Sequence, residues 1–262
     1  MPTHFPSLFV SHGAPTLYLE PQPARTFLLG LGARLPRPEA ILCVSAHWTT
    51  ERPTVTLAAR HQTIHDFYGF PEALYDVRYP APGAPQLARR VLELLTGAGI
   101  PAAGDDRRGL DHGAWVPLGL MYPQADIPVV QLSVQPDMPA REHLAIGEAL
   151  APLGREGVLV LGSGGATHNL GDVRWETPDL RGAPPPEYVR AFDAWLKAAV
   201  AAGDAQALTE YLGQAPYARR NHPTPEHFLP LFAPLARGGS ARLVHDSFCL
   251  GVLSMAAFVW ED

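Results

Sequence analysis

The chain has 262 residues, of which 47% are hydrophobic and 18% charged, a composition typical of a folded soluble protein with one large core. The net charge of −6 argues against a nucleic-acid partner, because such proteins hold the phosphate backbone with clustered lysine and arginine. Cys43 and Cys249 lack C-x-x-C spacing, which excludes a disulfide framework and a thiolate zinc site. Lys197, the only lysine, follows no glycine-rich phosphate loop.

Short apolar runs rich in β-branched residues recur along the chain and predict buried strands. In chain order these runs are Ser7–Val10, Ala40–Ser45, Pro128–Val134, Gly157–Leu161 and Arg242–His245. The segments with helical periodicity are Ala24–Leu35, Ala84–Ala98, Ala140–Leu153, Glu187–Ala202, Ala205–Gly213 and Pro225–Ala236. This alternation predicts an α/β fold, a three-layer α/β/α domain with a mostly parallel central sheet.

No internal repeat, charge block or linker divides the chain, so we expect residues 1–262 to form a single domain. The longest apolar stretch, Phe248–Trp260, is shorter than the roughly 20 residues that a membrane-spanning helix needs. The amino terminus has no basic start followed by an apolar region. We therefore expect a cytoplasmic protein with no membrane partner, present as a monomer or a small homo-oligomer.

Eleven histidines are the unusual feature of the composition. His12 and His47 directly follow predicted strands, and His168 follows a third strand through the glycine-rich residues 162–165, which we interpret as a sharp turn. Open α/β sheets bind ligands beyond the carboxyl ends of their parallel strands, so these three histidines are expected to converge there. Neutral imidazole is a common ligand of iron, zinc, copper and nickel, which makes a metal site the leading hypothesis. A polar loop or core role remains the alternative for each histidine.

Two further histidines lie in segments that we expect to be ordered loops. They are His112 in GLDHGAWVPL and His222 in RRNHPTPEHFLPL, just before the predicted helix at Pro225. Glu226 near the start of that helix is either a carboxylate ligand or a residue that meets the positive helix end, and we favour the latter. His143 is expected on a helix surface.

The segment TIHDFYGFP contains His65, Asp66, Phe67 and Tyr68. These side chains could form an aromatic wall with a polar contact over a planar substrate. A packed loop is the alternative.

Six segments, taken together and in this order, resemble the class III extradiol ring-cleavage dioxygenases, the superfamily of the catalytic subunit of protocatechuate 4,5-dioxygenase. The segments are SHGAPTLYLE, SAHW, TIHDFYGFPEALYDVRYPAPG, GLDHGAWVPL, GSGGATHNL and HPTPEHFLPL. Within this superfamily the resemblance is to the DOPA 4,5-dioxygenase branch, and it runs from Phe9 to Trp260. It implies a non-haem, metal-dependent enzyme that opens the ring of a small catechol with O2 to give a muconic semialdehyde.

The resemblance also implies roles for individual histidines. His12, His47 and His222 would hold one divalent metal ion, Fe(II) for dioxygenase activity, with Zn(II) as the alternative in the same site. His168 would act as the general acid/base or, as in zinc-containing members, as a fourth metal contact. His112 would lie in the pocket and help to bind the substrate or dioxygen.

The chain departs from the best-known relatives, which complete their metal site with a glutamate where this sequence has a histidine, unless Glu226 fills that role. The identity of the metal therefore stays open.

The resemblance and the chemistry of catechols lead to one expected reaction and two alternatives. A catechol bound near His65, Asp66, Phe67 and Tyr68 would lose a proton to His168, whose ordinary pKa lies near neutrality. Zinc cannot perform the redox step, so a zinc-loaded protein would be a hydrolase with a zinc-bound water or a catalytically silent relative.

Overall fold

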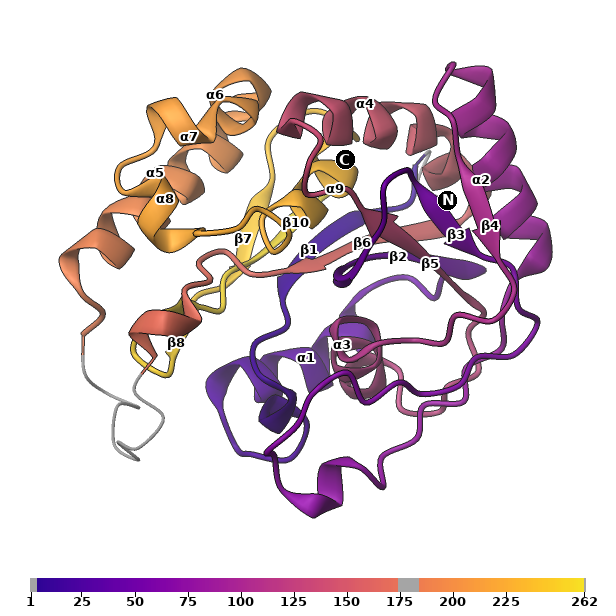
Figure 1. Cartoon of the computed structure of the whole chain (residues 1–262), viewed down its shortest axis with the longest axis horizontal. Helices are drawn as coiled ribbons and strands as arrows, with labels where there is room; N and C mark the ends of the chain where they lie inside the picture. Colours follow the sequence, from indigo (N-terminus) through magenta and orange to yellow (C-terminus); the bar gives the residue numbers. More distant parts are fainter. Residues whose placement is uncertain (1–3, 174–183, 262) are drawn as a thin grey trace.

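An eight-stranded sheet with helices on both faces forms the centre of the structure, a computed structural model that describes residues 4–173 and 184–261 (Figure 1). From one edge to the other the strands are β4 (Ala103–Asp105), β3 (Thr54–Thr56), β5 (Val129–Val134), β2 (Ala40–Thr49), β6 (Val158–Gly164), β1 (Ser7–Ser11), β10 (Ala257–Trp260) and β7 (Arg242–His245). A separate hairpin pairs β8 (Phe248–Cys249) with β9 (Leu253–Ser254).

The four central strands β5, β2, β6 and β1 are mutually parallel. The strands β10 and β7 continue the sheet in antiparallel pairing, and β3 pairs antiparallel with β5. The predicted α/β fold with a mostly parallel sheet is confirmed. Because the central strands run in one direction, their carboxyl ends lie on the same side of the molecule, where the strand-end histidines are expected.

Helices form a layer on each face of the sheet (Figure 1). One layer holds α1 (Pro23–Arg34) and α3 (His112–Met121). The other holds α2 (Pro85–Gly97), α4 (Ala140–Leu150) and α9 (Phe232–Leu235), with α5 (Glu187–Ala202), α6 (Ala205–Thr209), α7 (Tyr211–Gln214) and α8 (Ala218–Asn221) beside them. None of the helices within the two described ranges is long and apolar enough to cross a bilayer.

Strand β2 shows how the sheet separates two apolar cores. Ile41 and Cys43 face the core of α1 and α3, whereas Leu42 and Val44 face the core of α2, α4 and α9. Burial of each such aliphatic side chain stabilises the fold by about 1.5–3 kcal/mol. Since both faces are buried, the strand reads in the sequence as one continuous apolar run.

The helix α3 was not predicted, and the expectation of a loop around His112 is wrong. Gly113, Pro117 and Gly119 give this segment a poor helix propensity. Every residue of α3 is nevertheless buried, and the carboxylate of Asp111 accepts a hydrogen bond from the backbone N–H of Ala114 as the N-cap. Tertiary burial and the cap therefore outweigh propensity.

The predicted helix Pro225–Ala236 is also wrong. Residues 226–228 form a turn, which is followed by a short 3-10 helix, Leu229–Leu231, and by α9. Pro230 and Pro234 each lack the N–H group that a continuous α-helix would use, which explains the irregular path. The predicted helix Ala205–Gly213 is divided at Glu210 into α6 and α7.

His143 lies in the protein interior, so its predicted position on a helix surface is wrong. Its side chain is buried between α4 and the end of β5, and its Nε2 accepts a hydrogen bond of 3.1 Å from the backbone N–H of Gln135. Burial lowers the pKa of His143 to about 4. The folded protein therefore holds this ring neutral.

We predict that His143 makes the folded state less stable as pH falls. Between about pH 6.5, the ordinary histidine pKa, and about pH 4, the unfolded chain binds a proton that the folded state excludes. Between pH 7.5 and 5 the wild type should lose about 2 kcal/mol more unfolding free energy than His143→Gln, measured by urea denaturation. Parallel pH curves for the two proteins would contradict this prediction.

Candidate metal centre and pocket

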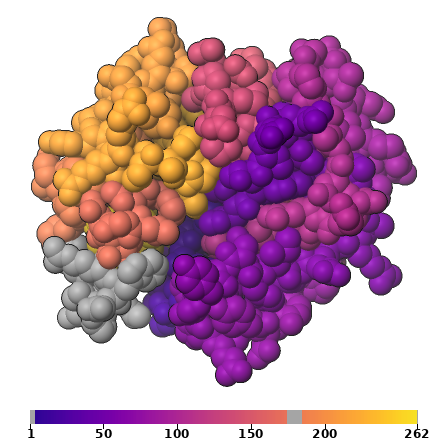
Figure 2. Space-filling view, viewed as in Figure 1, coloured from indigo at the N-terminus to yellow at the C-terminus, as the bar shows by residue number. Residues whose placement is uncertain are grey.

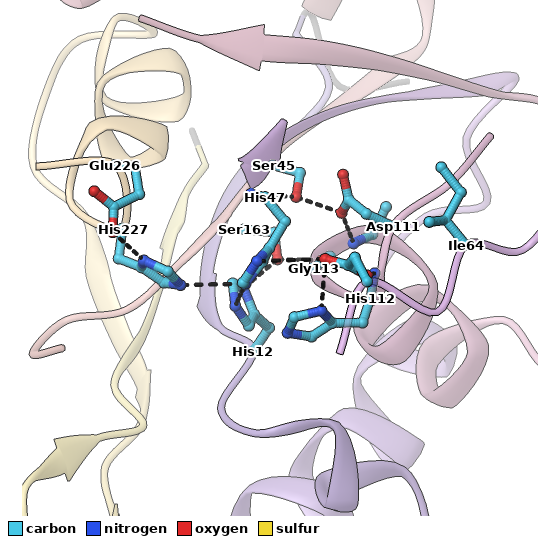
Figure 3. A network of polar contacts seen from close by, with 12 residues as sticks. His12, Ser45, His47, Ile64, Asp111, His112, Gly113, Ser163, Glu226 and His227 are labelled. Atoms are coloured by element: carbon cyan, nitrogen blue, oxygen red, sulfur yellow. Dashed lines mark hydrogen bonds and ion pairs between the residues drawn. The ribbon is translucent and has the colours of Figure 1, made fainter. Parts of the chain in front are cut away.

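Three histidine rings meet beyond the carboxyl ends of β1, β2 and β6. The Nε2 atom of His47 lies 2.9 Å from Nε2 of His12 and 3.2 Å from Nε2 of His227. Figure 3 shows the three rings pointing toward one another from separate segments of the chain. The convergence of His12 and His47 follows the sequence-based expectation, whereas no role in the site was expected of His227 from the sequence.

His47 reaches the centre because β2 is irregular near its carboxyl end. Val44 pairs with Leu132 of β5, but the next pairing joins Thr49 to Val134, so three extra residues accumulate on β2. Such a bulge turns a side chain out of the regular alternation. The guanidinium of Arg108 donates a hydrogen bond of 3.1 Å to the carbonyl oxygen of His47 and fixes this segment.

His227 reaches the centre because β6 carries glycines on the side that faces it. A Cβ atom on Gly164 would lie 2.2 Å from the carbonyl oxygen of His227, and one on Gly162 would lie 2.2 Å from the carbonyl oxygen of Pro230. The backbone N–H of Gly165 donates to the His227 carbonyl at 2.9 Å. The interpretation of residues 162–165 as a turn is therefore wrong for the first three of these positions, which lie in β6 and permit close backbone approach.

Hydrogen bonds on the outer sides of His12 and His227 fix where the protons of these two rings lie. Ser163 donates its hydroxyl proton to the carbonyl of Gly113, so its oxygen accepts from Nδ1 of His12 at 3.0 Å. The carboxylate of Glu226 accepts from Nδ1 of His227 at 3.0 Å, and Asp66 Oδ2 lies 3.4 Å from Nδ1 of His47. A neutral imidazole carries one proton, so the Nε2 atoms of His12 and His227 each present a lone pair to the centre.

Burial keeps these rings neutral. It lowers the pKa of His12, His47 and His227 well below the ordinary value, and the charges of neighbouring histidines lower each pKa further. The lone pairs of His12 and His227 both point toward Nε2 of His47, and a cation among the three nitrogens would bind them all. The donor set therefore fits a divalent metal ion, with an outer partner on each ligand ring.

Glu226 lies on the outer side of His227 rather than at the start of a helix. Its Oε1 accepts hydrogen bonds from Nδ1 of His227 and, at 2.9 Å, from the hydroxyl of Thr224. The favoured interpretation, that it meets a helix end, is wrong because no helix starts there. The carboxylate instead orients a ring of the cluster.

His222 lies outside the three-histidine cluster. Its Nε2 donates to the carbonyl of Ala166 at 3.1 Å, and its ring packs against Phe192 and Phe228. Burial lowers the pKa of His222 to about 3. In this position it supports the segment that leads to His168.

His168 stacks on His227, with ring centroids 3.4 Å apart and planes inclined by 6°. Its backbone N–H donates to the carbonyl of Asn221 at 2.9 Å. Burial, with a smaller contribution from the charge of His112, lowers the pKa of His168 to about 4. At neutral pH the ring is therefore a free base able to accept a proton.

His112 is the first residue of α3, and Asp66 holds it at two points. The carboxylate accepts from the backbone N–H and from Nδ1 of His112, both at 2.9 Å. Burial alone would raise the pKa of Asp66, but the hydrogen bonds and charges of His112 and the charge of His47 lower it to about 2.

These groups lie at one end of a pocket of about 190 Å³. Apolar side chains form much of its wall, namely Phe67, Phe70, Leu170, Leu253 and Met255. Figure 2 shows the hollow, with the indigo amino-terminal segment deep between the salmon residues after β6 and the purple loop after β3. The pocket is large enough for a small planar aromatic molecule.

The four predicted substrate contacts separate into two pairs. Asp66 and Phe67 line the pocket. His65 instead lies behind Phe67, with its Nε2 3.1 Å from the carbonyl oxygen of Val77, and Tyr68 is 92% exposed. The segment thus contributes an acid and an aromatic ring to the wall.

Comparison with known proteins agrees with the resemblance seen in the sequence. Residues 3–259 match the family described as the catalytic LigB subunit of aromatic ring-opening dioxygenase. The chain is 43% identical to 4,5-DOPA dioxygenase extradiol of Beta vulgaris over 259 residues, or 96% of this chain and 95% of the relative. It is 44% identical to 4,5-DOPA dioxygenase extradiol of Escherichia coli (strain K12) over 236 residues, or 87% and 83% of the two chains.

A crystal structure of an uncharacterized protein from Escherichia coli K12 has the same fold, with a TM-score of 0.80 and 35% identity. The match covers 97% of this chain and 99% of the other. Together these similarities favour the ring-opening dioxygenase over the zinc hydrolase that the sequence left open.

We predict that Gly164→Ala weakens metal binding although residue 164 is not a ligand. The new Cβ would displace the backbone of His227, and we expect zinc affinity to fall about 10- to 100-fold in a titration against a competing chelator. Gly165→Ala is the matched control, since its Cβ would meet its nearest neighbour, the carbonyl oxygen of Thr167, at 3.3 Å. Equal zinc affinity in the two variants would contradict the close-approach explanation.

Proposed function

Since the chain belongs to the family of the catalytic LigB subunit of aromatic ring-opening dioxygenases, we propose that it cleaves a small DOPA-like catechol beside its two hydroxyl groups, with O2, to a muconic semialdehyde. The observation that carries this proposal is the set of three Nε2 atoms at the end of an aromatic-walled pocket. The names of the relatives from Beta vulgaris and Escherichia coli support the substrate class.

His12, His47 and His227 are the residues that would hold the metal ion, which we propose to be Fe(II). When bound, Fe(II) would supply open coordination positions and the redox chemistry that ring opening with O2 requires, whereas zinc has no redox chemistry. The outer partners Ser163 and Glu226 support this role because each accepts the Nδ1 proton of one ring, His12 or His227.

His168 is the proposed general base. It lines the pocket and is neutral at pH 7, so it can accept a proton from a catechol hydroxyl and return it in a later step. Its stacking on His227 holds the ring next to the proposed metal ligands. In this scheme His168 acts beside the cluster rather than as a fourth ligand.

The other pocket residues bind the substrate and exclude water. Phe67 and Phe70 contact each other with centroids 5.4 Å apart and provide an aromatic surface for the ring of the catechol. Leu253 and Met255 extend the apolar wall on the side of the β8–β9 hairpin. His112 provides a polar atom for a substrate hydroxyl.

Oxygen uptake by protein loaded anaerobically with Fe(II) tests the proposal. We expect O2 consumption and a yellow ring-opened product with DOPA or another small catechol. His168→Gln should lower kcat by about 10²- to 10⁴-fold at unchanged iron content, because it removes the base and not a ligand. His245→Gln, outside the pocket, is the matched control.

Two results would count against these roles. The absence of O2 uptake across a panel of catechols, in protein with a full iron complement, would overturn the function. Full activity in His168→Gln would overturn the base assignment alone.

A further inference from the structure

The contacts of Asp66 give this residue a part in the site beyond that of a pocket wall. Oδ1 accepts the backbone N–H of His112, and Oδ2 accepts from Nδ1 of the same residue. Oδ2 also lies 3.4 Å from Nδ1 of His47. One carboxylate therefore joins a proposed metal ligand to a histidine that lines the pocket.

We propose that Asp66 is a positioning residue that fixes the tautomer of His112, so that the unprotonated Nε2 of His112 faces the substrate. The inference rests on the proposed function in one respect, namely that the group that donates a hydrogen bond to Nε2 is a hydroxyl of the substrate.

The tautomer follows from the donor and acceptor capacities of the two groups. An ionised carboxylate only accepts hydrogen bonds, so a His112 ring with a single proton carries it on Nδ1. Nε2 is on the side of the ring away from that contact, and His112 lines the pocket. The pocket thus contains a hydrogen-bond acceptor at a fixed place.

The surrounding structure fixes the position of His112 relative to Asp66. His112 begins α3, and the preceding residue, Asp111, caps the helix. Asp111 is fully buried and accepts hydrogen bonds from Ser45 at 2.6 Å and from Arg108 at 3.1 Å. The backbone N–H that binds Asp66 Oδ1 is therefore held by the start of the helix, and the ring can rotate only by breaking the contact to Oδ2.

An asparagine at position 66 would keep the size of the side chain but not its capacity to accept hydrogen bonds at both terminal atoms. The amide has a single acceptor oxygen, and its NH2 group can donate to Nδ1 of His112. In Asp66→Asn the proton of His112 is thus free to move to Nε2, which would present a donor to the substrate hydroxyl.

The direct test is nitrogen-15 NMR of the imidazole nitrogens in the metal-free protein, with the His112 signals assigned from His112→Gln. The wild type should carry the His112 proton on Nδ1, and Asp66→Asn should shift it to Nε2. Asp76→Asn, an exposed substitution on the same loop, is the matched control and should resemble the wild type. A wild-type His112 protonated on Nε2, or an unchanged tautomer in Asp66→Asn, would overturn the proposal.

Kinetics with the Fe(II)-loaded enzyme provide the second readout. For Asp66→Asn we expect kcat/KM to fall about 10- to 100-fold, with iron content equal to that of the wild type and partial recovery in Asp66→Glu. Loss of iron in Asp66→Asn would instead show that Asp66 acts through metal retention and would contradict the tautomer role. If the wild type consumes no O2 with any catechol, the proposed function fails, while the NMR result still decides the role of Asp66.

Discussion

The structure of the site depends on one electrostatic constraint, the close approach of three imidazole nitrogens whose rings burial keeps neutral. The Nε2 atoms of His12, His47 and His227 are separated from their nearest neighbours by 2.9 and 3.2 Å, distances that favour a shared cation. Each ring is held by a polar group on its outer side. Those groups in turn come from β6, from the long loop after β3 and from the turn after α8.

The carboxyl ends of the central strands bring the site residues together, and small local departures from regular structure orient their side chains. The irregularity in β2 turns His47 into the site, and Gly164 in β6 lets the backbone of His227 approach. The N-cap of α3 places His112 at the pocket beside Asp66. These features explain why residues far apart in sequence form one pocket, and why changes to residues that touch neither metal nor substrate are expected to alter the chemistry.

The sequence predicted those parts of the fold and site that depend on local pattern. The central strands were found because burial on both faces produces continuous apolar runs. His12 was found because it follows β1, and His47 because it follows the apolar, regularly paired part of β2. The short strands β3 and β4 and the helix α3 depend on tertiary contacts that leave little periodicity. His227 was missed because its place in the site depends on the close approach of its backbone to β6, which no local pattern around His227 shows. The glycines at alternate positions 162 and 164 are nevertheless a detectable sign of a close neighbour on one face of a strand.

Anomalous diffraction from crystals of the metal-loaded protein tests the central constraint most directly. We predict a single strong peak about 2.0–2.2 Å from the Nε2 atoms of His12, His47 and His227, with His168 beside it and His222 remote. A peak bonded to His222 instead of His227, or the absence of any peak among the three rings at full metal content, would contradict the proposed centre.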